Sequence, residues 1–101
     1  MSAFTSCNPA TGDVVFTRSV WSCKQLHQKL SALSHEGHAW SAMPLAQRAT
    51  QLLELASILT RERVAIAATV TLEVGRRTIE CLAEIDKSVQ LIRYYAELAP
   101  Q

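Results

Sequence analysis

The sequence of 101 residues predicts a mainly α-helical protein in which an N-terminal β-hairpin precedes about four helices. Within the first twenty residues, β-branched and aromatic side chains flank a proline–glycine turn signal, a pattern typical of strands. From residue 22 onward, apolar residues recur three and four positions apart, which keeps them on one face of a helix. We therefore divide the chain into a hairpin segment, residues 1–21, and a helical segment, residues 22–101.

The expected hairpin turns within the segment Asn-Pro-Ala-Thr-Gly-Asp, residues 8–13. Pro9 and Gly12 are turn-forming residues, and the Asn8 side chain can hydrogen-bond to its own backbone there. The residues on either side are predicted to form two short strands. Because an isolated two-stranded hairpin is only marginally stable in water, we expect this one to need a larger partner.

The first helix is expected to begin after Ser22, because a serine hydroxyl commonly caps a helix N-terminus. One apolar stripe follows on this helix and consists of Leu26, Leu30 and Leu33. Gly37 should end or weaken the helix. Pro44 suits the first turn of the next helix, where its missing N–H leaves no hydrogen bond unmade.

Two further helices are expected between Pro44 and Gly75. The first of them has an apolar face made of Leu45, Ala49, Leu52, Leu53, Ala56 and Leu59. The polar residues 60–63, Thr-Arg-Glu-Arg, interrupt this pattern and could hold a turn. A very apolar helix then carries Val64, Ala67, Ala68, Thr71, Leu72 and Val74. Gly75 should end it, because only glycine adopts a positive φ without strain.

The last helix is the most regular in its apolar pattern. Thr78 can cap its N-terminus, and Glu80 falls in its first turn, where the helix dipole favours a negative charge. Its buried stripe is predicted to consist of Leu82, Ile85, Val89, Ile92, Ala96 and Ala99. Pro100 should end the helix.

Charge and cysteine content limit the classes of partner. Ten basic and nine acidic residues give a net charge of +1, and no long run of like charge is present. This balance argues against nucleic acid or a membrane surface as a partner, since both need a concentrated basic field.

The chain starts without a secretory signal pattern, and its three cysteines, Cys7, Cys23 and Cys81, are scattered. We expect reduced thiols and a cytoplasmic location.

A metal site is conceivable at the sequence His-Glu-Gly-His, residues 35–38, but the spacing does not suit it. The zinc motif HExxH needs histidines four residues apart, whereas His35 and His38 are three apart. His27 lies eight residues before His35, and a zinc site needs three or four ligands. We interpret these histidines as part of a solvated helix end and predict no metal ligands.

Catalytic and coenzyme-binding residues are also not predicted. Cys23 and His27 have helix-neighbour spacing, so a thiol–imidazole pair is conceivable, but an ordinary surface thiol is the preferred interpretation. Glu80 and Glu84 lie one turn apart and are expected to face water or to meet a nearby basic residue, namely Arg76, Arg77 or Lys87. The three glycines are too far apart for a phosphate-binding loop.

Several short motifs, in order along almost the whole chain, resemble the N-terminal region of the NAD(P)-dependent aldehyde dehydrogenase superfamily. They are Asn-Pro-Ala-Thr-Gly at residues 8–12, Trp40, Arg48-Ala49 followed by Leu52, Glu73-x-Gly75-Arg76, Glu80, Glu84-Ile85, and Tyr-Tyr-Ala-Glu at residues 94–97. The opening motif and the spacing between Trp21 and Trp40 favour the succinate-semialdehyde dehydrogenase branch. Arg76 stands where the family usually has lysine, and Arg77 stands where proline is common.

The resemblance implies an α/β parent enzyme that oxidises an aldehyde to a carboxylic acid through a cysteine thiohemiacetal, with hydride passing to NAD or NADP. The family's nucleophilic cysteine, general base and coenzyme loops lie beyond the region matched. None of the three cysteines here sits in the nucleophile motif. The chain is therefore expected to be a scaffold portion, one partial domain, that holds no cofactor and is inactive by itself.

Two partners are compatible with this interpretation: the remainder of an aldehyde dehydrogenase, or a second copy of the chain. In the first case the helices cover a face of the coenzyme domain and the hairpin extends a sheet. In the alternative, the chain is a non-catalytic helical interaction or dimerisation module whose apolar stripes pack on one another. The apolar content of the helices leads us to expect self-association.

Overall fold

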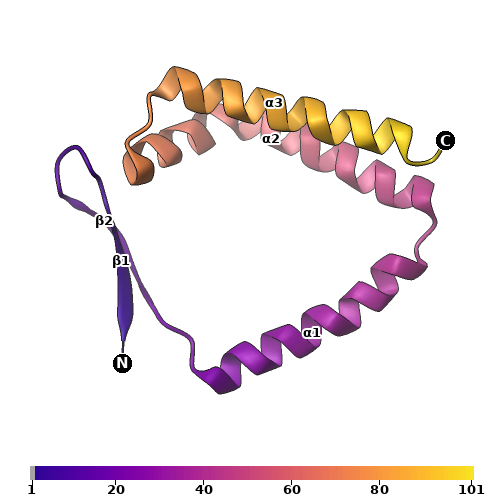
Figure 1. Ribbon diagram of the computed structural model, residues 1–101, viewed down its shortest axis with the longest axis horizontal. Coiled ribbons are helices and arrows are strands. Elements are labelled where there is room, and N and C mark those ends of the chain that lie inside the picture. The colour runs from indigo at the N-terminus through magenta and orange to yellow at the C-terminus, as the bar shows by residue number, and fades with distance from the viewer. Residues whose placement is uncertain (1) are drawn as a thin grey trace.

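The computed structural model describes residues 2–101 and consists of a two-stranded antiparallel sheet followed by three helices (Figure 1). The strands are β1 (Ala3–Cys7) and β2 (Val14–Ser19), and the helices are α1 (Cys23–Ala42), α2 (Leu45–Val74) and α3 (Thr78–Leu98). The predicted fold class, mainly α with an N-terminal hairpin, is confirmed.

The chain has an open shape rather than that of a compact domain. Its radius of gyration is 17.7 Å, whereas a compact domain of this length has about 13 Å. Figure 1 shows why: α2 and α3 lie side by side, whereas α1 runs away from the start of α2 and is joined through residues 20–22 to the hairpin, whose turn lies near the α2–α3 connection. The molecule measures 48 × 40 × 15 Å along its three principal axes, so it is broad and thin.

The hairpin forms as the sequence predicts. The strands pair in antiparallel register, with Phe4 opposite Arg18 and Thr5 opposite Thr17. At the turn, the Asn8 side-chain oxygen accepts a hydrogen bond of 2.9 Å from the backbone N–H of Ala10. Gly12 has φ of 80°, a left-handed conformation in which a side chain is strained.

Helix α1 begins at the predicted cap but ends later than expected. The Ser22 hydroxyl accepts from the backbone N–H of Gln25, whose side chain accepts from the Ser22 N–H, forming a capping box. Gly37 was expected to end or weaken this helix; it does not end the helix, since α1 continues to Ala42. A single glycine costs a helix about 1 kcal/mol, which the surrounding twenty-residue helix tolerates.

Helix α2 is continuous over thirty residues, so the turn expected at residues 60–63 is absent and the structure has three helices rather than about four. The polar residues there are accommodated within the helix. Thr60 donates its hydroxyl to the carbonyl of Ala56 at 2.8 Å, and Arg63 reaches across to Asp86 of α3. The interruption in the apolar pattern therefore marks a polar turn within one continuous helix rather than a helix end.

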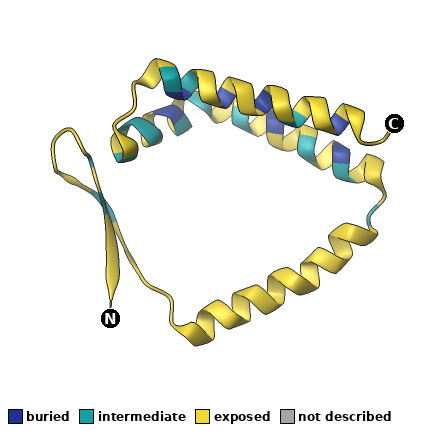
Figure 2. Cartoon of the chain, viewed as in Figure 1, coloured by how far each residue is buried: buried dark blue, intermediate teal, exposed yellow. Residues whose placement is uncertain are grey.

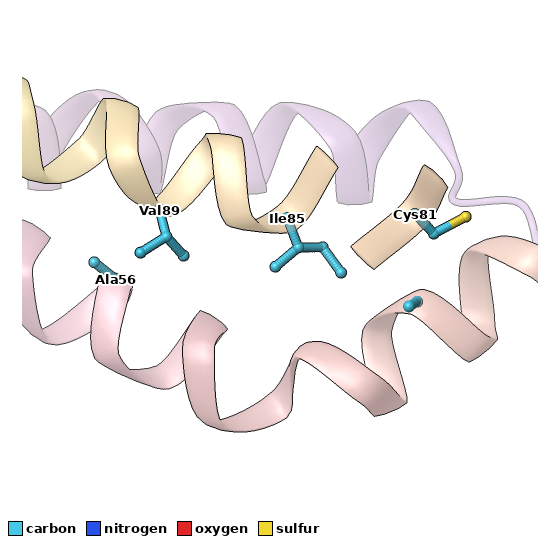
Figure 3. Packing of buried hydrophobic residues seen from close by; sticks show 5 residues of the cluster. Ala56, Cys81, Ile85 and Val89 are labelled. Atoms are coloured by element: carbon cyan, nitrogen blue, oxygen red, sulfur yellow. The ribbon is translucent and has the colours of Figure 1, made fainter. Parts of the chain in front are cut away.

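The core lies between α2 and α3. Its buried residues are Ala56, Ala67, Cys81, Ile85 and Val89 (Figure 3). Ala56 and Ala67 have no exposed surface, and their small side chains leave room for Ile85 and Val89 of the facing helix. Leu59, Ile66, Val70, Leu82 and Ile92 border this core and are partly buried.

The α2–α3 connection matches the prediction at Gly75 and departs from it at Thr78. Gly75 has φ of 76° and donates its N–H to the carbonyl of Thr71, as expected of a helix C-terminus. The N-cap of α3 is Arg77, with no side-chain cap, and Thr78 is already helical. The Thr78 hydroxyl pairs instead with the Thr71 hydroxyl at 3.2 Å, which links the two helices.

Candidate docking site

The described residues expose apolar side chains on every element, and α1 is the extreme case. No residue of α1 is buried, and its predicted stripe is open to solvent, with Leu26, Leu30 and Leu33 exposed by 48%, 53% and 67% (Figure 2). On the hairpin, Phe4 and Trp21 are more than half exposed. Large exposed apolar patches in a protein mark interaction surfaces.

The hairpin meets the helix pair at one point, and two of the quoted motifs form that contact. A Cβ atom on Gly75 would lie 2.6 Å from Cγ of Pro9, so only glycine fits there. Beside it, the Ser6 hydroxyl donates to a carboxylate oxygen of Glu73 at 3.2 Å. The Asn-Pro-Ala-Thr-Gly turn and the Glu-x-Gly segment thus pack together, which sequence spacing alone did not reveal.

Glu80 and Glu84 are each engaged with an arginine. A guanidinium nitrogen of Arg76 lies 2.9 Å from Glu84, and Nε of Arg77 lies 3.1 Å from Glu80. This agrees with the interpretation of the two glutamates as partners of nearby basic residues. The pairs are solvent-exposed and close the turn between α2 and α3.

The histidines and cysteines do not converge. All three histidines lie along α1, Cys7 and Cys23 are exposed, and Cys81 is buried in the α2–α3 core. The Cys81 sulfur is 3.8 Å from the Thr71 hydroxyl, consistent with packing as a small apolar residue. In residues 2–101, no three His, Cys, Asp or Glu side chains are grouped closely enough to hold a metal ion.

A small hollow lies where α1 leads into α2 and where α3 ends. It has a volume of about 170 Å³ and is lined by Trp40, Leu45, Arg48, Ala49, Leu52, Tyr95, Ala96 and Ala99. The resemblance motifs Trp40, Arg48-Ala49, Leu52 and Tyr-Tyr-Ala-Glu come together here from three helices. Sequence analysis identified these residues but gave no signal that they share one site.

The aldehyde dehydrogenase family model matches residues 1–101. The chain belongs to the aldehyde dehydrogenase family. A probable succinate-semialdehyde dehydrogenase [NADP(+)] of Synechocystis is 33% identical over 98% of this chain and 22% of its own length. A succinate-semialdehyde dehydrogenase [NADP(+)] of Deinococcus radiodurans is 24% identical over 96% of the chain and 20% of its length.

Solved structures agree with this aldehyde dehydrogenase assignment at the level of the fold. Gox0499, studied for cofactor and substrate selection, matches with a TM-score of 0.90 and 25% identity over 98% of this chain and 22% of its own. Betaine aldehyde dehydrogenase of Staphylococcus aureus, solved with NAD+, matches with a TM-score of 0.88 and 24% identity over 99% of this chain and 21% of its own. The chain therefore corresponds to the N-terminal portion of the family, about a fifth of its relatives' length.

None of the helices in residues 2–101 has both the length and the apolar character required to cross a membrane.

Proposed function

We propose that this chain is the N-terminal scaffold portion of an NAD(P)-dependent aldehyde dehydrogenase that oxidises an aldehyde to a carboxylic acid. The observation that supports this most directly is the set of open apolar surfaces on a chain that the family model matches from end to end. In this proposal the nucleophilic cysteine, the general base and the coenzyme loops belong to the remainder of the enzyme. The chain contributes shape and apolar surface rather than reacting groups.

Each part of the chain has a role in this proposal. The α2–α3 pair, which packs together within the chain, covers a face of the coenzyme domain. The strand edges of the hairpin extend a sheet of the enzyme body. The hairpin segment, residues 1–21, and the helical segment, residues 22–101, form one partial domain joined at the Pro9–Gly75 contact. The names of the Synechocystis and Deinococcus relatives favour a short semialdehyde as substrate and NADP as coenzyme. We place the enzyme in the cytoplasm, in keeping with its three free cysteines.

Complementation tests this proposal. The 101-residue chain is co-expressed with the Synechocystis relative from which the matching segment, about a fifth of its length, has been removed. We expect the two pieces to copurify and to form NADPH in the presence of succinate semialdehyde, while neither piece forms it alone. Turnover by the purified chain alone, or no association with the truncated relative, would contradict the proposal.

A second function is favoured by the exposed apolar stripe on α1, which a second copy of the chain could cover. In this alternative the chain is a non-catalytic helical interaction module that forms a homodimer. Size-exclusion chromatography with light scattering separates the two. A discrete dimer with a cooperative thermal transition supports the interaction module. Self-association that is replaced by a complex once the truncated relative is added supports the scaffold.

A further inference from the structure

Arg48 differs from the other arginines of α2 because one nitrogen of its half-buried guanidinium, Nε, is shielded from solvent without an acceptor. Among residues 2–101, Nε of Arg48 is the buried side-chain nitrogen or oxygen that has no hydrogen-bond partner. Arg61 and Arg63 of the same helix both form ion pairs, with Glu62 and Asp86. The described chain therefore brings a cation to the hollow and supplies no anion for it.

A buried guanidinium nitrogen without an acceptor is costly. An unsatisfied buried donor loses its hydration, at a cost of about 1–3 kcal/mol and more when the group is charged. Such a group persists where a partner supplies the acceptor, and the strongest acceptor for a guanidinium fork is a carboxylate.

Resting on the function proposed above, we propose that the hollow around Arg48 receives an aspartate or glutamate side chain from the body of the dehydrogenase. The carboxylate pairs with Arg48 and fixes the position of this scaffold on the enzyme. The hollow is thus the polar anchor within an otherwise apolar docking surface. Charge complementarity selects the occupant, since none of the residues that line the hollow is acidic.

The size and lining of the hollow favour a side chain over a small molecule. Its volume of about 170 Å³ is below the roughly 300–1,000 Å³ of pockets that bind coenzymes and drug-sized ligands. Its walls present apolar groups around the single cation, with Trp40, Leu45 and Tyr95 exposed by 39%, 41% and 55%. Those walls are suited to the apolar residues that flank an acidic one in a docking segment.

Affinity of the chain for the truncated Synechocystis relative tests this inference. Arg48→Met and Arg48→Gln should weaken binding by on the order of thirtyfold or more, because a buried charge loses its partner. Arg48→Lys keeps the charge but not the planar fork, so it should recover only part of the affinity. The matched control Arg61→Met removes an exposed arginine of the same helix and should stay within about twofold of the unsubstituted chain.

Each outcome bears on a different proposal. If the unsubstituted chain does not bind the relative, the scaffold function fails and this inference fails with it. If it binds and Arg48→Met binds equally well, the anchor alone is wrong. If Arg48→Gln, which keeps an uncharged N–H donor, binds as tightly as the unsubstituted chain, the positive charge is not needed and the acidic occupant is wrong.

Stability of the chain by itself supplies a second, independent readout. An anchor that waits for an outside partner contributes nothing to the isolated chain, so Arg48→Met should leave its melting temperature unchanged or raise it. A clear drop in melting temperature would show that Arg48 serves the internal packing of α2 and α3. That result would overturn the inference whatever the binding data.

Discussion

The α2–α3 pair and helix α1 are built from similar sequence patterns, yet only the pair has a core. Both regions carry apolar residues three and four apart, but Ile85 and Val89 face Ala56 on a neighbouring helix, while Leu30 and Leu33 face solvent (Figures 2 and 3). An amphipathic pattern therefore predicts that the apolar face of a helix will be buried, but it does not predict which element buries it. The apolar faces of α2 and α3 bury each other within the chain. For α1, we propose that the body of the enzyme buries the apolar face.

The largest contrast is expected from truncating one apolar residue in each region. Ile85→Ala removes a side chain that is 8% exposed and should lower the free energy of unfolding by about 2–4 kcal/mol through lost burial and a cavity. Leu30→Ala, at a position that is 53% exposed, should change it by less than about 0.5 kcal/mol. Urea denaturation followed by circular dichroism measures both. Equal losses would show that α1 packs within the chain.

The glycines extend the comparison to the backbone. Gly75→Ala should cost more than the roughly 1–2 kcal/mol of a left-handed residue, because its Cβ also meets Pro9 at 2.6 Å. Gly12 has a similar φ of 80°, and a Cβ there would have no neighbour within 4 Å. Gly12→Ala therefore measures the cost of the left-handed backbone conformation alone. Gly37→Ala, inside α1 with open space around it, should stabilise that helix by about 0.5–1 kcal/mol. Thermal melting of the three variants tests this ranking.

The capping box tests whether α1 depends on its own ends. Because α1 has no buried residue, local interactions carry most of its stability within the chain. Ser22→Ala should cost about 1 kcal/mol, seen as a loss of helical circular dichroism at low denaturant while the α2–α3 transition is unchanged. A shift of the main transition by the same amount would mean that α1 and the pair unfold together.

The smallest effect is expected at the ion pair between α2 and α3. Arg63 and Asp86 form two parallel hydrogen bonds of 2.9 and 2.7 Å, but both side chains are at least one-third exposed. A double-mutant cycle with Arg63→Ala and Asp86→Ala should give a coupling of about 0.2–1 kcal/mol that shrinks in high salt. A larger coupling energy that persists in high salt would show that this ion pair contributes substantially to the stability of the α2–α3 pair.

Local signals in the sequence predicted local structure well. The Ser22 cap, the glycine end of α2 and the hairpin turn each depend on a few neighbouring residues, and all are confirmed. The expected breaks at Gly37 and at residues 60–63 were wrong, because helix propagation is cooperative and a weak residue or a polar turn does not outweigh it.

Contacts between distant residues were beyond sequence reasoning. The packing of Pro9 on Gly75 joins positions 66 residues apart, and the surroundings of Arg48 come from three helices. In each case the motifs were identified in the sequence without any sign that their residues meet. The structure supplies the reason at Gly75, where a side chain has no room, and poses a question at Arg48, where an acceptor is missing.

Hydrogen exchange tests the central claim most directly, by comparing amide protection in α1 and in the α2–α3 pair, first for the chain alone and then in complex with the truncated Synechocystis relative. We predict that the pair is protected in both samples, while α1 exchanges freely in the isolated chain and becomes protected in the complex. Protection of α1 equal to that of the pair in an isolated monomer would contradict the account, because it would show that the chain covers its own apolar faces.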